Sequence, residues 1–288
     1  MRKYFLTFAS TDLNKTLNRI RNQAEKLNFY DKILTYSELN LDINFKDQFS
    51  KYLKHGTRGY GYWSWKPQII LQALSLMEDG DILQYTDAGC HLNINGIKRL
   101  NDYFEITNNS DFGILAFQTK IPEDPLVYDG REMLDCVDFK WIKGDLVDHF
   151  NIRSNEYILQ TQTITATVIF IKKTSDTVNF INHWLDVIKY DFRLIDDTKS
   201  ISNNLDGFIE HRHDQAIFSI LCKLKNIDTL SAYEYWYPSK INKFKPDWKI
   251  LSEYPILAKR DKKFDIISFL SILIWRINRK LKRIFLKF

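Results

Sequence analysis

Residues 59–91 read GYGYWSWKPQIILQALSLMEDGDILQYTDAGCH. It begins with a cluster of aromatic residues and glycines, continues into an apolar run after Pro67, and ends with ILQYT followed by Asp87. Proline is favoured in the first turn of a helix, and Asp-Gly-Asp marks a turn. The sequence therefore predicts a helix over 67–77 and a buried strand over 82–86, with an aspartate directly after the strand.

The flanking sequence repeats this alternation of strands and helices. Residues 3–8, KYFLTF, read as a first buried strand, and the apolar residues that follow have helical spacing at Leu13, Leu17, Ile20, Ala24 and Leu27. The same reasoning predicts strands at 32–37, 112–118 and 166–172 and helices at 95–105, at 174–190 and after 211–215. Such an alternation predicts an α/β fold of Rossmann type, with a mixed, mainly parallel sheet flanked by helices.

Length and composition fit one globular body. The chain has 288 residues, of which 44% are hydrophobic and 27% charged, and it has no internal repeat or low-complexity linker. Its three cysteines are widely spaced and odd in number, which indicates a reducing compartment rather than a disulfide framework. The apolar run at the start of the chain is too short for a signal peptide and reads better as a strand.

The basic residues are concentrated at the C-terminal end. Residues 259–288 carry ten of the 41 Lys and Arg but two of the 36 Asp and Glu, so this segment has a charge of +8 and the remaining residues −3. We therefore divide the chain into a catalytic-type body, 1–258, and a basic tail, 259–288. A body of charge −3 argues against a uniformly basic nucleic-acid surface.

The tail has the pattern of a C-terminal amphipathic helix at a membrane surface. Its apolar run 266–275 is shorter than the roughly 20 residues that a bilayer span needs. Basic and apolar side chains then separate onto two helical faces, which predicts binding of 264–288 to an anionic membrane surface. The alternative is a helix docked on the body or in an oligomer contact.

Asp87 is the first candidate for chemistry. In open α/β sheets, ligands bind beyond the carboxyl ends of the strands. An aspartate in this position, followed by Ala-Gly, can bind a cation or a metal-bound phosphate, or it can cap the turn that follows.

The aromatic block, residues 55–67, is the second candidate. Arg58 and Lys66 could face a diphosphate, and aromatic rings of the block could stack on a base or sugar: Tyr60, Trp63 and Trp65. The alternative is a packing segment of the core.

The third candidate is HRHDQ, residues 211–215, at the start of a predicted helix. His211 or His213 could bind a divalent metal and Arg212 a phosphate. Alternatively, Asp214 caps the helix.

Taken together, three short blocks resemble bacterial GT-A-type glycosyltransferases of capsule, O-antigen and lipooligosaccharide biosynthesis. The blocks are RGYGYWSWKP (58–67), DGDILQYTDAG (79–89) and HRHDQAIFS (211–219). The resemblance implies a GT-A-like fold and a hexosyltransferase of EC class 2.4. Such an enzyme moves a sugar from a nucleotide-sugar donor to a hydroxyl of a glycan or lipid-linked acceptor. The rival hypotheses are a non-catalytic, membrane-associated carbohydrate-binding or partner-binding protein and a nucleic-acid enzyme.

The resemblance also implies roles for single residues. Asp87 would bind a divalent metal, Mn²⁺ or Mg²⁺, or a ribose near the donor diphosphate. The family pattern is Asp-x-Asp, and this chain has Gly89 where the second aspartate is expected. Either His211 or His213 then completes the metal site, or the cations of the aromatic block neutralise the diphosphate.

The remaining implied roles concern the acceptor and the location. Asp214 would be the catalytic base or an acceptor ligand, and Gln162 and Gln215 would lie near the anomeric carbon. Because acceptors of such enzymes are often lipid-linked, the resemblance implies a cytoplasmic protein at the inner face of the cytoplasmic membrane, held there by 264–288.

Overall fold

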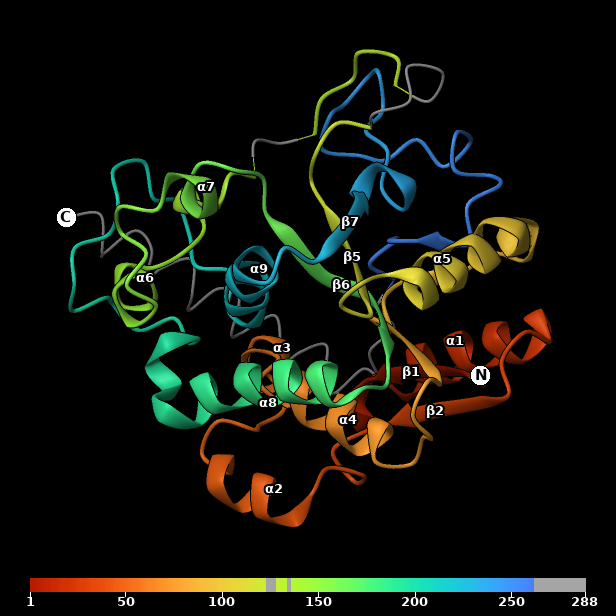
Figure 1. The fold of residues 1–288 in the computed structure, drawn as a ribbon, viewed down its shortest axis with the longest axis horizontal. Coiled ribbons are helices and arrows are strands. Elements are labelled where there is room, and N and C mark those ends of the chain that lie inside the picture. Colours follow the sequence, from red (N-terminus) through yellow and green to blue (C-terminus); the bar gives the residue numbers. More distant parts are fainter. Residues whose placement is uncertain (123–127, 134–135, 262–288) are drawn as a thin grey trace.

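A computed structural model describes residues 1–122, 128–133 and 136–261 (Figure 1). Six strands form one sheet in the order β2-β1-β3-β6-β5-β7. These strands are β1 (Lys3–Phe8), β2 (Lys32–Tyr36), β3 (Ile82–Thr86), β5 (Ile114–Gln118), β6 (Ile164–Lys172) and β7 (Asp228–Ser231). β6 is antiparallel to both of its neighbours, and the other strands run parallel to one another. The predicted mixed, mainly parallel sheet is thereby confirmed.

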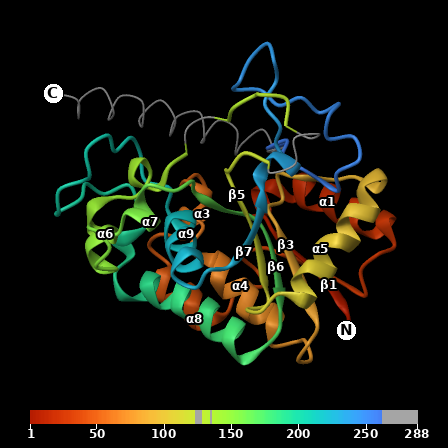
Figure 2. The ribbon, with the colours of Figure 1, turned by 45° about the horizontal axis from the view of Figure 1, so that its top comes forward.

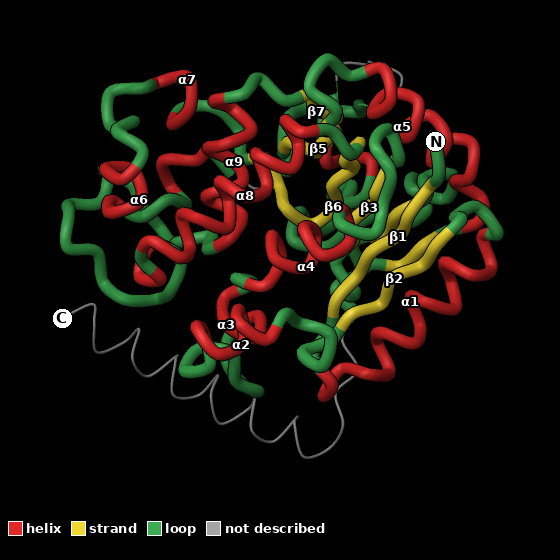
Figure 3. Tube along the Cα trace, turned by 60° about the horizontal axis from the view of Figure 1, so that its bottom comes forward, coloured by secondary structure: helices red, strands yellow, loops and turns green. Residues whose placement is uncertain are grey.

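Helices cover both faces of this sheet. They are α1 (Asn14–Leu27), α2 (Ile43–Phe49), α3 (Gly59–Tyr62), α4 (Trp65–Leu74), α5 (Ile97–Asn109), α6 (Gly144–His149), α7 (Glu156–Leu159), α8 (Ser175–Tyr190) and α9 (Asp214–Leu224). Figure 2 shows α1 and α5 on one side of the strands and α4, α8 and α9 on the other. The molecule therefore has three layers, with the sheet in the middle (Figure 3).

Strand β1 shows why both faces are covered. Its residues alternate between two apolar cores, with Tyr4, Leu6 and Phe8 facing one and Phe5 the other. Successive side chains of a strand point to opposite faces of the sheet, so a strand with apolar side chains on both faces requires a helix layer on each side.

The predicted elements and the observed ones agree closely in the first half of the chain. β3 has the predicted bounds, and α4 starts two residues before Pro67. Helices α2 and α7 were not predicted. Three features of the sheets were also not predicted: the reversed direction of β6, strand β7, and a small second sheet made by β4 (His91–Leu92) and β8 (Ile256–Leu257). Each of them depends on pairing between distant segments.

The predicted membrane helix, 264–288, lies outside the described residues. Among the helices that are described, none is both long enough and apolar enough to cross a bilayer.

Candidate active site

One large cavity, of about 1210 Å³, follows the carboxyl ends of the parallel strands. Its floor is built from the residues that come directly after these strands, namely Ala9 and Ser10 after β1, Asp87 to Cys90 after β3, Thr119 after β5 and Ala232 after β7. The first residues of the antiparallel strand β6 complete it, namely Thr165, Ala166 and Thr167. The cavity therefore occupies the place where open α/β sheets bind ligands.

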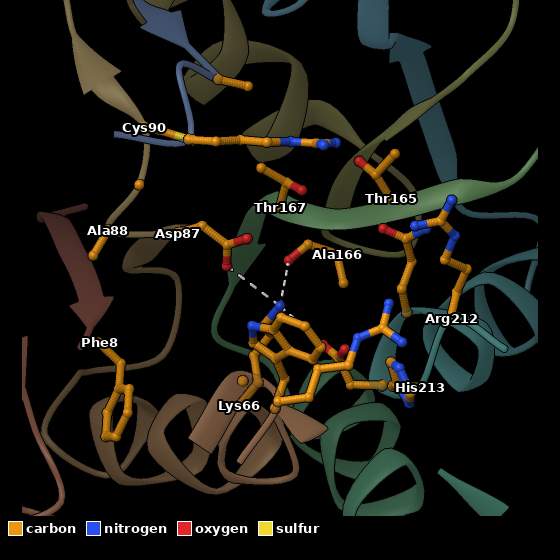
Figure 4. A pocket seen from close by; sticks show the side chains of 18 of the residues that line it. Phe8, Lys66, Asp87, Ala88, Cys90, Thr165, Ala166, Thr167, Arg212 and His213 are labelled. Carbon is orange, nitrogen blue, oxygen red and sulfur yellow. Dashed lines mark hydrogen bonds and ion pairs between the residues drawn. The ribbon is translucent and has the colours of Figure 1, made fainter. Parts of the chain in front are cut away.

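A buried ammonium lies at the centre of the site. The Nζ of Lys66 donates to the carbonyl oxygen of Ala166 at 2.9 Å and lies 2.9 Å from Asp214 Oδ2 and 3.4 Å from Asp87 Oδ1 (Figure 4). Asp87 Oδ1 also accepts the hydroxyl hydrogen of Tyr85 at 2.7 Å. The first turn of α4, the end of β3, the start of α9 and strand β6 thus meet at one nitrogen atom.

Burial and charge oppose each other in this cluster. Burial by itself would lower the pKa of Lys66, but the carboxylates of Asp214 and Asp87 raise it above the ordinary value of lysine. Burial raises the pKa of Asp214 to about 6, although Lys66 acts in the opposite direction. The Asp214 side chain is 5% exposed and the Asp87 side chain 32%, so Asp87 is the carboxylate that a ligand can reach.

The aromatic block forms a turn of left-handed helix. All five residues from Gly59 to Trp63 have positive φ, between 52° and 88°. The amide of Tyr62 donates to the carbonyl of Arg58 at 2.7 Å, and the amide of Trp63 to that of Gly59 at 3.2 Å. A left-handed helical conformation costs an L-residue about 1–2 kcal/mol, so Tyr60, Tyr62 and Trp63 raise the free energy of this turn. Non-glycine residues in such conformations cluster at functional sites.

Packing of the aromatic rings stabilises the strained turn. The ring of Trp65 stacks on Phe8 with 3.9 Å between ring centroids, and its indole N–H donates to the carbonyl of Gly59 at 2.9 Å. Trp65 lines the cavity and is 4% exposed, so its ring supports the cavity wall, and stacking on a ligand stays a prediction. Tyr60 and Trp63 are half-buried and line the cavity, as the donor-binding prediction requires.

The two histidines of HRHDQ are held by the backbone. In His211, Nδ1 accepts a hydrogen bond from the Lys143 amide at 3.3 Å and Nε2 donates to the carbonyl of Leu194 at 2.8 Å. Because both ring nitrogens are hydrogen-bonded and the side chain is buried, neither nitrogen is left to bind a metal. The pKa of His211 is lowered to about 3 by burial, which keeps the ring neutral. The Nδ1 of His213 donates to the carbonyl of Ile195 at 2.5 Å.

His213 fixes the position of the aspartate that follows it. Its φ of 55° and ψ of −127° are rarely adopted by a residue with a side chain. Its ring lies beside Tyr62 and Trp63, with centroid distances of 5.1 and 5.7 Å. Ring packing and the backbone hydrogen bond thus hold the strained residue, and Asp214 begins α9 at the cavity.

The other predicted site residues divide into two groups. Arg58, Arg212 and Gln215 line the cavity. Gln162 does not line it, because this residue forms a bridge with Val137 and its amide oxygen accepts from Thr119 Oγ1 at 3.4 Å. A role of Gln162 near the anomeric carbon therefore does not fit this structure.

The residues predicted to hold a divalent metal do not fit such an ion. The Lys66 ammonium already lies between Asp87 and Asp214, where a cation would sit. In the residues that the structure describes, no group of three or more His, Cys, Asp or Glu side chains comes together as a metal site. A site with one reachable carboxylate and an ammonium against it is poorly suited to Mg²⁺ or Mn²⁺, which prefer several oxygen ligands.

Two arginines important to the site were missed in the sequence. The guanidinium of Arg19, on α1, donates to the carbonyls of Cys90, Ala88 and Asp261 at 2.7, 2.8 and 3.2 Å. It thereby fixes the turn after Asp87. Arg260 lines the cavity, although we had placed residues 259–261 in the tail. No local pattern marks either residue, because their partners are distant in sequence.

Comparison with known proteins gives no sequence match, since no family model matches the chain and no curated protein matches it. Solved structures with a similar arrangement do exist. A glycosyltransferase involved in the glycosylation of the major capsid of PBCV-1 is 9% identical, with a TM-score of 0.45, over 89% of this chain and 94% of that one. The galactosyltransferase LgtC is 12% identical, with a TM-score of 0.41, over 81% and 74%.

A third similar structure is the apo-form glycosyltransferase GlyE of Streptococcus pneumoniae. It is 11% identical, with a TM-score of 0.45, and the match covers 98% of this chain and 64% of that one.

Proposed function

We propose that this chain is a glycosyltransferase that moves a sugar from a nucleotide-sugar donor to a hydroxyl group of an acceptor glycan. The observation that carries the proposal is the division of charge within one cavity. Asp87 and Asp214 share a single ammonium and so leave a net negative charge at the floor, while Arg212 and Arg260 bring positive charge to the same cavity.

This division of charge matches the reaction. The bond between the anomeric carbon and the phosphate oxygen breaks with its electron pair going to the diphosphate, so positive charge develops on the sugar and negative charge on the leaving group. Fixed charges of opposite sign at these two places stabilise the transition state. The acceptor oxygen then forms the new bond to the anomeric carbon.

Asp87 is the carboxylate that we assign to the reacting sugar and acceptor. It is more exposed than Asp214, and its carboxylate is held by an ion pair with Lys66 and a hydrogen bond from Tyr85. In this role Asp87 accepts the proton that the acceptor hydroxyl loses. Asp214 orients Lys66 and thereby Asp87, and the aromatic rings of Tyr60 and Trp63 provide a stacking surface for the nucleotide base or a sugar ring.

Replacing Asp87 with asparagine tests the proposal. We expect transfer or hydrolysis of the matching donor to fall about 100- to 10,000-fold, the usual contribution of a positioned base. The measurement is turnover of a panel of UDP-, GDP-, CDP- and TDP-sugars, with Mn²⁺, Mg²⁺ or EDTA. The matched control is Asp79→Asn, because Asp79 is a highly exposed surface carboxylate. Binding of a sugar without any turnover would instead support a non-catalytic carbohydrate-binding protein.

The acceptor and the location complete the proposal. We propose a lipid-linked or surface-polysaccharide acceptor of the capsule, O-antigen or lipooligosaccharide type. We also propose a peripheral position at the inner face of the cytoplasmic membrane, through the +8 charge of residues 259–288.

Truncation tests the membrane proposal. A chain ending at Asp261 keeps the residues that contact Gly89 and removes most of the basic tail. We expect the full chain to sediment with vesicles that contain an anionic phospholipid, and the truncated chain to stay in solution with an unchanged melting temperature. Equal sedimentation of both chains would contradict a tail-based attachment.

A further inference from the structure

We propose that this site neutralises the diphosphate of its ligand with the guanidinium groups of Arg212 and Arg260, and that it needs no divalent metal. The inference rests on the proposed function for the identity of the ligand as a nucleoside diphosphate. It concerns the charge chemistry of the cavity, which can be measured without knowing the sugar or the acceptor.

The position between the two carboxylates is already filled by a cation. Lys66 Nζ donates a hydrogen bond to the carbonyl of Ala166 and forms ion pairs with Asp214 and Asp87. Lys66 is almost completely buried, and its carboxylate neighbours favour its charged form. A divalent ion bound to Asp87 would lie against this ammonium and be repelled by it.

The segment that carries Arg260 passes beside position 89. The amide of Asp261 donates to the carbonyl of Gly89 at 3.0 Å. A Cβ atom at position 89 would lie 3.4 Å from the Cα of Arg260, which is ordinary van der Waals contact, so the returning chain passes directly beside this position. Arg19 binds both segments through their carbonyl groups. Where the Asp-x-Asp pattern has its second acid, this fold therefore places the segment that carries Arg260.

Arg212 is the second cation of the proposed anion site, and it lines the cavity. Its guanidinium lies over the ring of Trp141, 4.1 Å from the centroid, and it forms no ion pair with any carboxylate in the described part of the chain. Burial lowers the pKa of Arg212, the charge of Glu210 raises it, and the charges of Arg58 and Arg260 lower it. Arg58 differs, since it is paired with Asp197 and Glu210.

Arg212 and Arg260 line the same cavity, neither forms an ion pair with a carboxylate of the described residues, and together they form a binding site for an anion. Guanidinium binds phosphate oxygens through two parallel hydrogen bonds, and such charge-assisted bonds are about twice as strong as neutral ones. The Trp141 ring holds Arg212 in place before a ligand arrives, which reduces the entropy lost on binding. These groups supply the charge that a metal ion supplies in an Asp-x-Asp site.

Calorimetric titration with inorganic pyrophosphate and with UDP, GDP, CDP and TDP tests the inference. We expect pyrophosphate and the preferred nucleotide to bind in EDTA, with a Kd changed less than about twofold when Mn²⁺ replaces EDTA. Arg212→Gln and Arg260→Gln should each raise the Kd about tenfold or more, because a charge-assisted hydrogen bond contributes about 1.5–3 kcal/mol. Arg193→Gln is the matched control, because Arg193 is exposed and paired with Asp191.

The outcomes separate this inference from the proposed function. Binding that requires Mn²⁺, failure of pyrophosphate to bind, or unchanged affinity in both arginine variants would overturn the inference. Because Arg260 is exposed, its variant keeps the test valid even if Arg212→Gln fails to fold. EDTA-resistant pyrophosphate binding without transfer from any donor would overturn only the glycosyltransferase proposal, and transfer that depends on Mn²⁺ would overturn only the present inference.

Discussion

Replacing Lys66 with methionine is expected to lower the free energy of unfolding by about 3–5 kcal/mol at neutral pH, because it leaves buried carboxylate charge without a partner. The ammonium is 3% exposed and lies 2.9 Å from Asp214 and 3.4 Å from Asp87. We also expect activity to fall at least about 100-fold, since Asp87 loses a group that orients it. Chemical denaturation and donor turnover are the two measurements.

The pH dependence of this effect has a defined sign. The pKa of Asp214 is raised to about 6, so its carboxyl group takes up a proton as the pH falls through that value. A protonated Asp214 no longer needs the ammonium. Because Lys66 lowers the pKa of Asp214, the carboxyl group of Lys66→Met takes up its proton at a pH above about 6. The stability deficit of Lys66→Met relative to the wild type should therefore be largest in alkaline solution, become smaller as the pH falls, and be smallest at and below pH about 6.

Two further variants make this prediction specific. Lys66→Met combined with Asp214→Asn removes the ammonium and one carboxylate together, so it should be more stable than Lys66→Met alone. Lys26→Met is the matched control, because Lys26 is exposed on α1. If Lys66→Met were as stable and active as Lys26→Met, the central role of the ammonium would be refuted.

Replacing Gly59 with alanine is expected to distort the left-handed turn and to cost about 2–4 kcal/mol. Its φ of 60° disfavours a side chain, and an added Cβ atom would lie 2.3 Å from the ring of Trp63. The ring must move to avoid this contact, which displaces part of the cavity wall. We therefore expect weaker nucleotide binding in addition to the lower free energy of unfolding.

Gly80→Ala is the matched control for this substitution. Gly80 also has a positive φ, of 88°, but a Cβ atom there would meet nothing within 4 Å. It should cost only about 1 kcal/mol, from the backbone conformation. The difference between the two variants in denaturation and in nucleotide titration measures the effect of the Trp63 ring. Equal stability and equal binding of the two variants would show that the position of the Trp63 ring does not depend on the lack of a side chain at Gly59.

Local patterns were sufficient to predict most of the sheet. Strand β3 and helix α8 follow from runs of apolar residues and from the turns and caps beside them, which involve neighbours in the sequence. The rule that ligands bind at the carboxyl ends of strands then led to Asp87. The direction of β6 could not be predicted, because a continuously apolar strand has the same pattern whether its neighbours are parallel or antiparallel.

By itself the sequence determined an α/β body, the strand that delivers Asp87, and the polar clusters that contribute Lys66, Arg212 and Asp214. Only the tertiary structure decided how these residues work together. It placed the Lys66 ammonium between the two carboxylates, used both ring nitrogens of His211 for backbone contacts, and brought Arg260 to the cavity. The physical reason is that charge neutralisation and saturation of hydrogen bonds depend on distances between segments that are far apart in the chain.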